Sequence, residues 1–443
     1  MSQTRRDFLK HSGILSAGLI TFKPFGGGSR VWAADSDAVN ALATTPAYTG
    51  LYPIHQGLTF EDLAYLSVLR PKTAELSFEV VDSKNAKQSL LAVQAVGMKG
   101  SDLQLDRFKA TGLQLGQTYK FRVLDAKGKI VDERNFKTLD TNKKNPKVAV
   151  ASCMNDFFKS ACTQMWASLG NQSPDMVFLV GDTCYADNDN DGTQLGFWKR
   201  YTETRTKIGF FRHKNLVPVM AVWDDHDFGG NNFDGSYAGK QFTLELFSNF
   251  WLYPEHDKYK RGVGVSQVLS IFGYKFCLMD DRFYRNDSTQ WGDTQKDQLF
   301  ETLSSDNTPA FLMNGSQFFG GYLKKDAYEY KQAKDLSSIC QQLARINAPV
   351  CFVSGDVHFS EVMQIESKLL GYKTFEITSS SMHSFTYLGN HLRKKNPRRL
   401  AATSKHNFTI LQLDNTTSKF KFTSTAFDED GDKKINKSLE IVR

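Results

Sequence analysis

Five apolar segments of the sequence each end directly in a cluster of polar side chains. In α/β proteins, side chains that bind ligands or carry out chemistry gather where the carboxyl ends of strands meet. Because each cluster follows its apolar segment at once, we expect all five to lie at one edge of a sheet. The clusters are Ser152-Cys153, Gly181-Asp182, Asp224-Asp225-His226, Asp280-Asp281-Arg282 and Gly355-Asp356-Val357-His358.

The side chains in and beside these clusters are ones that bind metal ions. Carboxylate oxygens suit Ca²⁺, Mg²⁺ or Mn²⁺, whereas a thiolate, a phenolate and imidazoles together favour a more strongly polarising ion such as Fe³⁺ or Zn²⁺. The thiol here is Cys153, and the phenol is Tyr185, which follows Asp182 by one turn. Two neighbouring metal ions can activate a water molecule and neutralise charge on phosphoryl oxygens. The residue types therefore predict hydrolysis of phosphate esters.

Each cluster also has a purely structural interpretation. Asp182 could cap a helix while Tyr185 packs in the core, and His358 could be a loop histidine with ordinary hydrogen bonds. The three acids around His226 at a strand end are harder to explain in this way, because their like charges repel unless cations are present. The sequence therefore favours a metal site over a set of unrelated loops.

In their order along the chain, these motifs resemble those of the alkaline phosphatase D family, within the calcineurin-like metallophosphoesterase superfamily. The resemblance covers roughly residues 147 to 385 and implies a hydrolase of phosphate mono- or diesters that uses a metal-activated hydroxide. The matching motifs are Ala151-Ser152-Cys153, Gly181-Asp182-x-x-Tyr185, Trp223-Asp224-Asp225-His226-Asp227 with Asn231, Asp280-x-Arg282-x-Tyr284-Arg285, Gly355-Asp356-Val357-His358-x-Ser360-Glu361 and, more weakly, Thr378-Ser379-Ser380 through His383.

The resemblance implies a metal-binding role for six residues. Asp182 would bridge the metal ions, and Cys153, Tyr185 and His358 would complete an iron-like first site. The second site would hold one or two Ca²⁺ ions, with Zn²⁺, Mn²⁺ or Mg²⁺ as alternatives to this Fe³⁺ and Ca²⁺ pairing. The residues implied for the second site are Asp225 and Asp356.

Four further residues would act on the substrate. His226 takes the place of the superfamily's histidine that faces the leaving group, and Asn231 is an extra metal ligand or a phosphate contact. Arg282 and Arg285 would hold phosphate oxygens, because a guanidinium binds such oxygens in a bidentate manner.

The roles of three acidic residues stay open on sequence grounds. Asp281 could add a metal ligand or weaken the positive charge of the arginines, and Glu361 could orient His358 or act directly. Asp187 begins a stretch like the start of a Ca²⁺ loop, but Trp198 stands where an EF-hand needs Glu. A complete EF-hand is therefore excluded, while Asp187 itself could reach the metal site.

The elements that must position these residues form two domains. Short alternating strands with turn residues between them predict a small fibronectin type III-like β-sandwich over residues 45–140. A polar, Lys-rich linker follows, and continuous apolar strands separated by helix-length segments then indicate a sheet that is largely parallel at its centre. Residues 147–443 are thus expected to form an α/β (α+β sandwich) metallophosphoesterase core, with two central β-sheets flanked by helices.

The first residues predict export. Arg5 and Arg6 fit the twin-arginine signal pattern, a short apolar stretch follows, and small residues near Ala33 offer a cleavage site. Residues 1–34 are therefore interpreted as a signal peptide for the twin-arginine export machinery, which places the mature protein in the periplasm or outside the cell. No segment approaches the roughly 18 apolar residues of a membrane-spanning helix.

The composition of the chain limits the kinds of molecule that the protein is expected to bind. The chain has 443 residues and a net charge of +7, with no basic stripe interleaved with aromatic residues, so nucleic-acid binding is not indicated. A mild positive field would attract small-molecule or lipid phosphate esters. Two alternatives stay open: a phospholipase D-like phosphodiesterase that acts on lipids or polymers, and a non-catalytic surface-binding protein that metal ions stabilise.

Overall fold

The computed structural model describes residues 49–251, 259–320, 327–386, 389 and 396–443. The predicted signal peptide and the first residues of the predicted N-terminal domain lie outside the described residues. All of the described residues belong to one compact unit. Within the described part of the chain, none of the helices has the length and apolar character needed to cross a membrane.

The N-terminal strands form one seven-stranded sheet in the order β1-β2-β5-β4-β3-β6-β7, in which all neighbours are antiparallel. Alternate residues of β6, such as Phe121 and Val123, point into a separate apolar cluster, as expected for a sheet with one covered face. The fibronectin type III-like topology and the domain boundaries stay predictions. The strands are β1 (Ile54–Thr59), β2 (Leu63–Pro71), β3 (Leu76–Val81), β4 (Lys87–Gly97), β5 (Leu103–Thr111), β6 (Thr118–Asp125) and β7 (Ile130–Lys137).

The second sheet has six strands in the order β10-β9-β8-β19-β20-β21. Its first three strands are parallel, and the three C-terminal strands continue it in antiparallel fashion. Its strands are β8 (Lys147–Ala151), β9 (Met176–Val180), β10 (Val219–Val222), β19 (Phe408–Leu413), β20 (Phe420–Phe427) and β21 (Lys433–Ile441).

The third sheet has eight strands in the order β11-β12-β13-β14-β15-β17-β16-β18, and the four from β13 to β17 are parallel. Each of the five apolar segments that precede the polar clusters is a strand: three are β8, β9 and β10 of the six-stranded sheet, and two are β13 and β15 of this one. The strands are β11 (Tyr259–Arg261), β12 (Gln267–Ile271), β13 (Tyr274–Leu278), β14 (Ala310–Met313), β15 (Val350–Ser354), β16 (Ser360–Ile365), β17 (Thr374–Thr378) and β18 (Arg399–Thr403).

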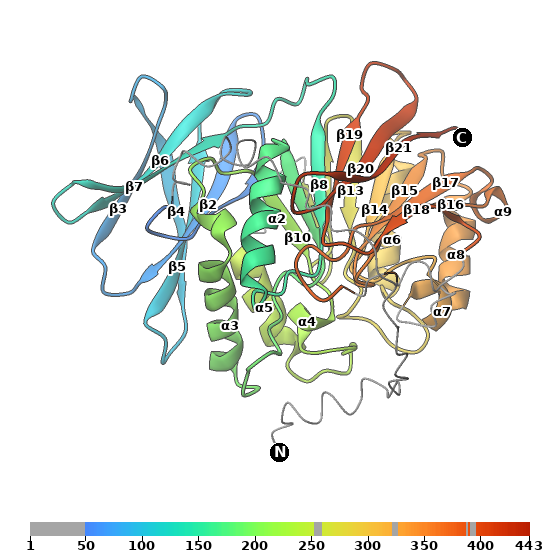
Figure 1. Ribbon diagram of the computed structural model, residues 1–443, viewed down its shortest axis with the longest axis horizontal. Coiled ribbons are helices and arrows are strands. Elements are labelled where there is room, and N and C mark those ends of the chain that lie inside the picture. Colours follow the sequence, from blue (N-terminus) through green and yellow to red (C-terminus); the bar gives the residue numbers. More distant parts are fainter. Residues whose placement is uncertain (1–48, 252–258, 321–326, 387–388, 390–395) are drawn as a thin grey trace, which may run out of the picture. The chain divides into compact units, whose positions relative to one another are not determined.

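The six-stranded and eight-stranded sheets share one apolar core, which makes this part of the chain an α/β sandwich. Phe178 of β9 lies 4.8 Å from Phe276 of β13, measured between ring centroids, so aromatic side chains fill the space between the sheets. Helices α2 to α5 lie on the side of β8–β10, and helices α6 to α8 lie on the side of β13–β17 (Figure 1). The helices are α2 (Lys159–Asn171), α3 (Gln194–Lys207), α4 (Asp225–Phe228), α5 (Lys240–Trp251), α6 (Asp293–Ser304), α7 (Tyr328–Lys331), α8 (Ala333–Leu343) and α9 (Ser367–Leu370), with a short 3₁₀ helix η2 (Gly209–Arg212).

Glycines let the two sheets approach each other at the carboxyl ends of their central strands. Gly181 follows β9 with a positive φ of 87°, and a Cβ atom there would lie 2.6 Å from the Cβ of Asp224. A Cβ atom on Gly315, which follows β14, would lie 2.8 Å from the same atom. Only glycine tolerates such contacts. The loops after β9, β10 and β14 are therefore held together at one end of the sandwich.

Candidate metal centre

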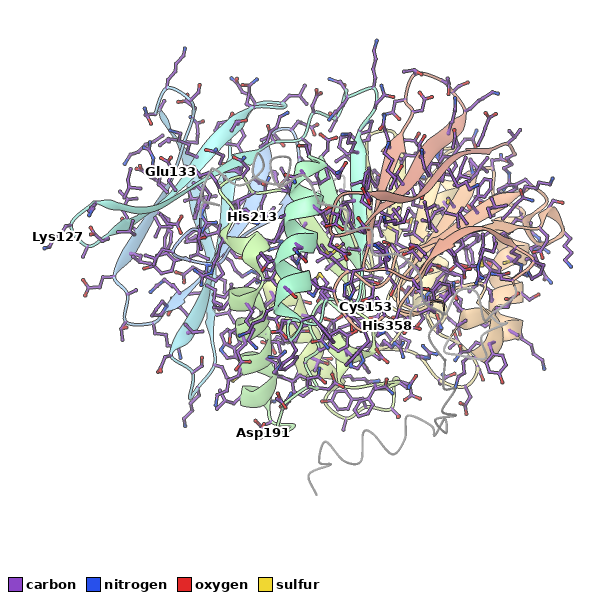
Figure 2. The ribbon with its side chains drawn as sticks, viewed as in Figure 1. Lys127, Glu133, Cys153, Asp191, His213 and His358 are labelled. Atoms are coloured by element: carbon purple, nitrogen blue, oxygen red, sulfur yellow. The ribbon has the colours of Figure 1, made fainter. Side chains whose placement is uncertain are left out.

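One group of possible metal ligands joins the ends of three strands. The ligand atoms of Cys153, Asp182 and His358 all lie within 4.8 Å of one another. Cys153 follows β8, Asp182 follows β9, and His358 follows β15, so residues far apart in the sequence converge as the strand-end pattern predicts. Figure 2 shows Cys153 and His358 at this end of the sandwich.

A second group shares one member with the first. The ligand atoms of Asp182, Asp225 and His226 also lie within 4.8 Å of one another. Asp225 and His226 are the first two residues of the short helix α4, which begins directly after β10 and Asp224. Asp182 thus belongs to both groups, which is the position that a bridging carboxylate needs.

Four of the predicted metal ligands have left-handed backbone conformations. The φ angles are 57° at Cys153, 50° at Asp182, 67° at Asp356 and 56° at His358. Residues with a side chain rarely adopt this region, which costs about 1–3 kcal/mol each and is typical of functional sites. The clustering of four such residues therefore supports a functional site independently of their chemistry.

The phenol and the remaining carboxylate lie beside these groups. The hydroxyl of Tyr185 is 3.3 Å from Nε2 of His358, and its ring stacks on that of His226 with 4.2 Å between centroids. The Cys153 thiol donates to the backbone carbonyl of Asp356 at 3.7 Å. Five of the six residues for which the resemblance implies metal binding therefore belong to these groups or contact them through a side chain, whereas Asp356 contacts Cys153 through its backbone and acts on Asp182 through its charge.

The charges in this cluster fit a cation. Burial raises the pKa of Asp182 well above its ordinary value, and the nearby carboxylates, among them Asp225 and Asp356, add to this effect against the opposing His226. Burial likewise raises the pKa of Cys153, and Asp182 raises it further. Acidic groups that are packed this closely repel one another unless positive charge lies between them. Two metal ions would supply that charge, so the residues present fit the ions that the resemblance implies.

Asp227 ties the turn after β9 to helix α4. Its carboxylate accepts hydrogen bonds from the backbone N–H of Thr183 at 3.0 Å and of Cys184 at 2.8 Å. It also accepts the backbone N–H of Asp224 at 3.2 Å. The residues flanking Asp182 and Asp225 are thereby fixed to each other, a role for Asp227 that the sequence did not predict.

His226 is held by Asp187, which the sequence left open. Nδ1 of His226 lies 2.8 Å from the carboxylate of Asp187. Burial lowers the pKa of His226, but Asp225, Asp182 and Asp187 outweigh this and raise it well above its ordinary value. Asp187 therefore orients the imidazole, and in the metal-free protein the surrounding carboxylates favour its protonated form. In the run after Asp187, Asn190 donates to the carbonyl of Ala186 at 2.8 Å and Asp191 accepts the hydroxyl of Thr193 at 2.6 Å, which are contacts of the turn before α3.

The predicted substrate-binding residues differ in their surroundings. Arg282 is completely buried and donates to Asp224, and Arg285 is 5% exposed and donates to the hydroxyl of Ser316 at 3.3 Å. Asn231 is exposed in the turn after α4. The backbone N–H of its neighbour Asn232 donates to Asp225 at 2.6 Å.

Asp281 and Glu361, whose roles the sequence left open, accept hydrogen bonds from other parts of the chain. Asp281 accepts the backbone N–H of Ser316 at 2.6 Å. Glu361 accepts hydrogen bonds from Gln317 at 2.9 Å and from Arg399 at 2.7 Å. These contacts give both carboxylates a part in holding the loops around the centre.

The segment after β17 supports the first group of ligands. The hydroxyl of Ser380 lies 3.2 Å from the sulfur of Cys153 and accepts the backbone N–H of His358 at 2.9 Å. His383, by contrast, bonds through Nδ1 to the carbonyl of Asn155 at 3.0 Å and through Nε2 to the indole of Trp166 at 3.2 Å. Both of its ring nitrogens are therefore engaged away from the metal ligands.

Comparison with known proteins agrees with this architecture. A solved structure described as "Structure of PhoD" has a TM-score of 0.67 to this chain at 14% sequence identity, covering 90% of this chain and 94% of that chain. The chain therefore has a PhoD-like fold. Structures of Astrotactin-2 and of amylomaltase from Corynebacterium glutamicum have TM-scores of only 0.17 and 0.16, at 10% and 11% identity. They cover 34% and 46% of this chain, and 28% and 33% of their own. They support no argument. The sequence matches no family model and no curated protein.

Proposed function

We propose that this protein is an exported, metal-dependent phosphoesterase that hydrolyses phosphate mono- or diesters. The observation that carries the proposal is the position of Asp182 in both groups of ligand atoms, next to an imidazole that Asp187 orients. The PhoD-like fold supports it. A protein that only used metal ions for stability would not need the His226–Asp187 pair beside them.

The donor atoms indicate different ions for the two halves of the centre. Cys153, Tyr185 and His358 offer a thiol, a phenol and an imidazole to the first half, which suits Fe³⁺ or Zn²⁺. Asp225 and Asp356 offer carboxylates to the second half, which suits Ca²⁺, with Mn²⁺ or Mg²⁺ as alternatives. When bound, such ions supply Lewis acidity and a water molecule that loses its proton near neutral pH.

The protein's own groups then serve binding and proton transfer. Protonated His226 donates a proton to the oxygen of the leaving alcohol, while Asp187 holds the Nδ1 side of the ring. Arg285 and Asn231 are the phosphate contacts of this proposal. The carboxylates of the centre exclude a negatively charged phosphate until cations are present, so binding of substrate depends on binding of metal.

The proposed location rests on the twin-arginine pattern. That route carries folded proteins, which suits an enzyme that acquires its metal ions before export. The proposal places the mature protein in the periplasm or in the medium, where phosphate esters of small molecules or lipids would be its substrates.

The test compares metal-stripped and metal-reloaded protein that has been purified from a host able to export it. Three substrates are offered: p-nitrophenyl phosphate, bis(p-nitrophenyl) phosphate and a phosphatidylcholine vesicle. We expect the reloaded protein to hydrolyse at least one ester and the stripped protein to hydrolyse none. The order of the rates separates a phosphomonoesterase from a phosphodiesterase, and preference for the vesicle indicates the phospholipase D-like alternative. Reloaded protein that leaves all three esters intact would refute the proposal.

A further inference from the structure

A buried ion pair lies directly beneath helix α4. Nε of Arg282 donates to the carboxylate of Asp224 at 2.5 Å, and both side chains are at most 1% exposed. Asp224 is the residue immediately before α4, and its backbone carbonyl accepts the N–H of Phe228 at 3.0 Å. One member of the pair, Asp224, is therefore the residue on which Asp225 and His226 depend for their position.

The other nitrogens of Arg282 are also engaged with the protein. Nη2 donates to the hydroxyl of Ser316 at 2.9 Å, and Nη1 donates to the backbone carbonyl of Phe233 at 3.3 Å. Ser316 follows β14, and Phe233 belongs to the loop after α4. One guanidinium thus connects the residue before α4, the loop after it and the neighbouring sheet. A side chain with no exposed surface and three engaged nitrogens is not presented to a substrate.

A single carboxylate, that of Asp280, holds the residue before Asp224 and the backbone of Arg282. Asp280 accepts the indole N–H of Trp223, the residue before Asp224, at 2.8 Å. It also accepts the backbone N–H of Arg282 at 3.0 Å. The amide of Gln295 grips the backbone of Asp280 from the other side, accepting its N–H at 2.7 Å and donating to its carbonyl at 2.8 Å. Asp280 therefore sets the end of β10 and the arginine turn in one fixed relation.

We propose that Arg282 is a positioning residue, which fixes the start of helix α4 through Asp224 and thereby places Asp225 and His226 in the second half of the metal centre. The proposal rests on the proposed function and deepens it, because it assigns phosphate binding to Arg285 and not to Arg282. Buried ion pairs contribute little net stability, since desolvation offsets their attraction, but removal of one partner leaves a costly unpaired charge. Their use for fixing geometry is the better explanation of this pair.

The experiment compares Arg282→Met, Arg285→Met and a matched control in the full-length protein. Arg398 is the control, because it is an arginine whose side chain is only 17% exposed and pairs with Glu329 and Glu366 away from the centre. Metal content, binding of inorganic phosphate to fully loaded protein, and kcat and KM are measured for each. We expect Arg282→Met to weaken binding of the second metal ion by about 10- to 100-fold, as removal of supporting groups does. Its phosphate affinity when loaded should change by less than about threefold.

Arg285→Met should show the opposite pattern. We expect it to retain both metal ions and to weaken phosphate binding by about 10- to 100-fold, since a charge-assisted contact is lost. Arg398→Met should leave both quantities unchanged. Arg282→Lys serves as a second variant in case the Met variant does not fold, and it should restore part of the metal affinity, because Lys keeps the charge but cannot reach three acceptors.

A double variant tests the route through Asp224. If Arg282 acts through this carboxylate, Asp224→Asn with Arg282→Met should lose no more metal affinity than the worse single variant. The inference is overturned if Arg282→Met keeps the second metal ion, whether or not its phosphate affinity falls. It is also overturned if the two losses of metal affinity add. Failure of loaded wild-type protein to hydrolyse any ester would refute the proposed function instead, while the metal and phosphate measurements would still decide the role of Arg282.

Discussion

The two halves of the candidate metal centre share Asp182 but are built in different ways. In the first half, Cys153 and His358 come from different strands of different sheets, each in a left-handed conformation. In the second half, Asp225 and His226 are consecutive residues at the start of one short helix. The first half therefore depends on how the two sheets approach each other, whereas the second half, to which we assign Asp356 as well, depends in addition on the orientation of one helix turn.

This difference has a consequence for the ions. The first half joins strand ends in fixed backbone conformations and offers a thiol, so it should bind its ion tightly and select among metals. The second half offers mainly carboxylates, which bind hard cations less tightly than a thiolate binds iron or zinc, so its ion should exchange more readily. Removal of individual ligands tests whether the two halves bind their ions independently.

The largest effect is expected at the residue that both halves share. Asp182→Asn should abolish binding of both ions and lower kcat/KM by more than about 10⁴-fold, because no bridging carboxylate remains. Metal analysis and phosphate ester assays measure both. Asp428→Asn is the matched control, since Asp428 is also a buried carboxylate but pairs with Lys405 and Lys434 in a hairpin turn. If Asp182→Asn retained two ions, the two halves would not share a ligand.

The next effect separates the halves. Cys153→Ser should release the first ion and keep the second, whereas Asp225→Asn should do the reverse, and each should lower kcat/KM by about 10²- to 10³-fold. With iron in the first site, the loaded protein should show a visible charge-transfer band that Cys153→Ser weakens and Asp225→Asn leaves in place. Loss of both ions in either variant would contradict the division into two halves, and a colourless active protein would exclude iron.

A smaller effect concerns the imidazole of the second half. His226→Ala should slow hydrolysis of alkyl phosphates about 10²-fold more than that of aryl phosphates, because a phenolate leaves without help from a proton donor. Asp187→Asn should give the same pattern at about one tenth of the size, since it removes only the orientation of the ring. Equal slowing of both substrate types would show that His226 does not act on the leaving group.

Strand ends are easier to predict from the sequence than the contacts that surround them, and the motif after β10 shows why. The position of a strand end is encoded locally, so Asp225 was predicted to reach the centre. The same motif holds three carboxylates with three different contacts: Asp224 pairs with Arg282, Asp225 joins the metal group, and Asp227 binds the turn at Thr183. Which of them faces the centre depends on the rotation of α4, and that rotation depends on contacts with segments far away in the sequence, such as the one that holds Arg282.

The burial of Arg282 could not be predicted from local sequence either. A guanidinium that follows a strand end and an acid has the sequence pattern of a phosphate contact. Its complete burial arises because the loops after β10 and β14 approach each other across Gly315, a contact between segments about ninety residues apart in the chain. No local pattern encodes such an approach. The role of Ser380 beside Cys153 was hidden for the same reason.

The smallest effect on activity is expected at His383. This histidine lies near the first half of the metal centre, but its ring nitrogens bond to Asn155 and Trp166. Burial lowers its pKa to about 4, from an ordinary value near 6.5, and its contacts with Asn155 and Trp166 fit the neutral ring. Because the folded pKa lies below the unfolded one, the unfolded chain binds the proton more tightly. The neutral ring therefore stabilises the fold fully above about pH 6.5, and this stability is lost as the pH falls toward 4.

His383→Gln should consequently keep both metal ions and lose less than about threefold in activity at neutral pH, although general destabilisation of about 1–2 kcal/mol is expected from the buried site. Its free energy of unfolding should fall less steeply than that of the wild-type protein between about pH 6.5 and 4, measured by denaturant titration of the metal-free forms. An unchanged slope would mean that the ring titrates normally. Loss of the first metal ion would show instead that His383 is needed for metal binding in the first half of the centre.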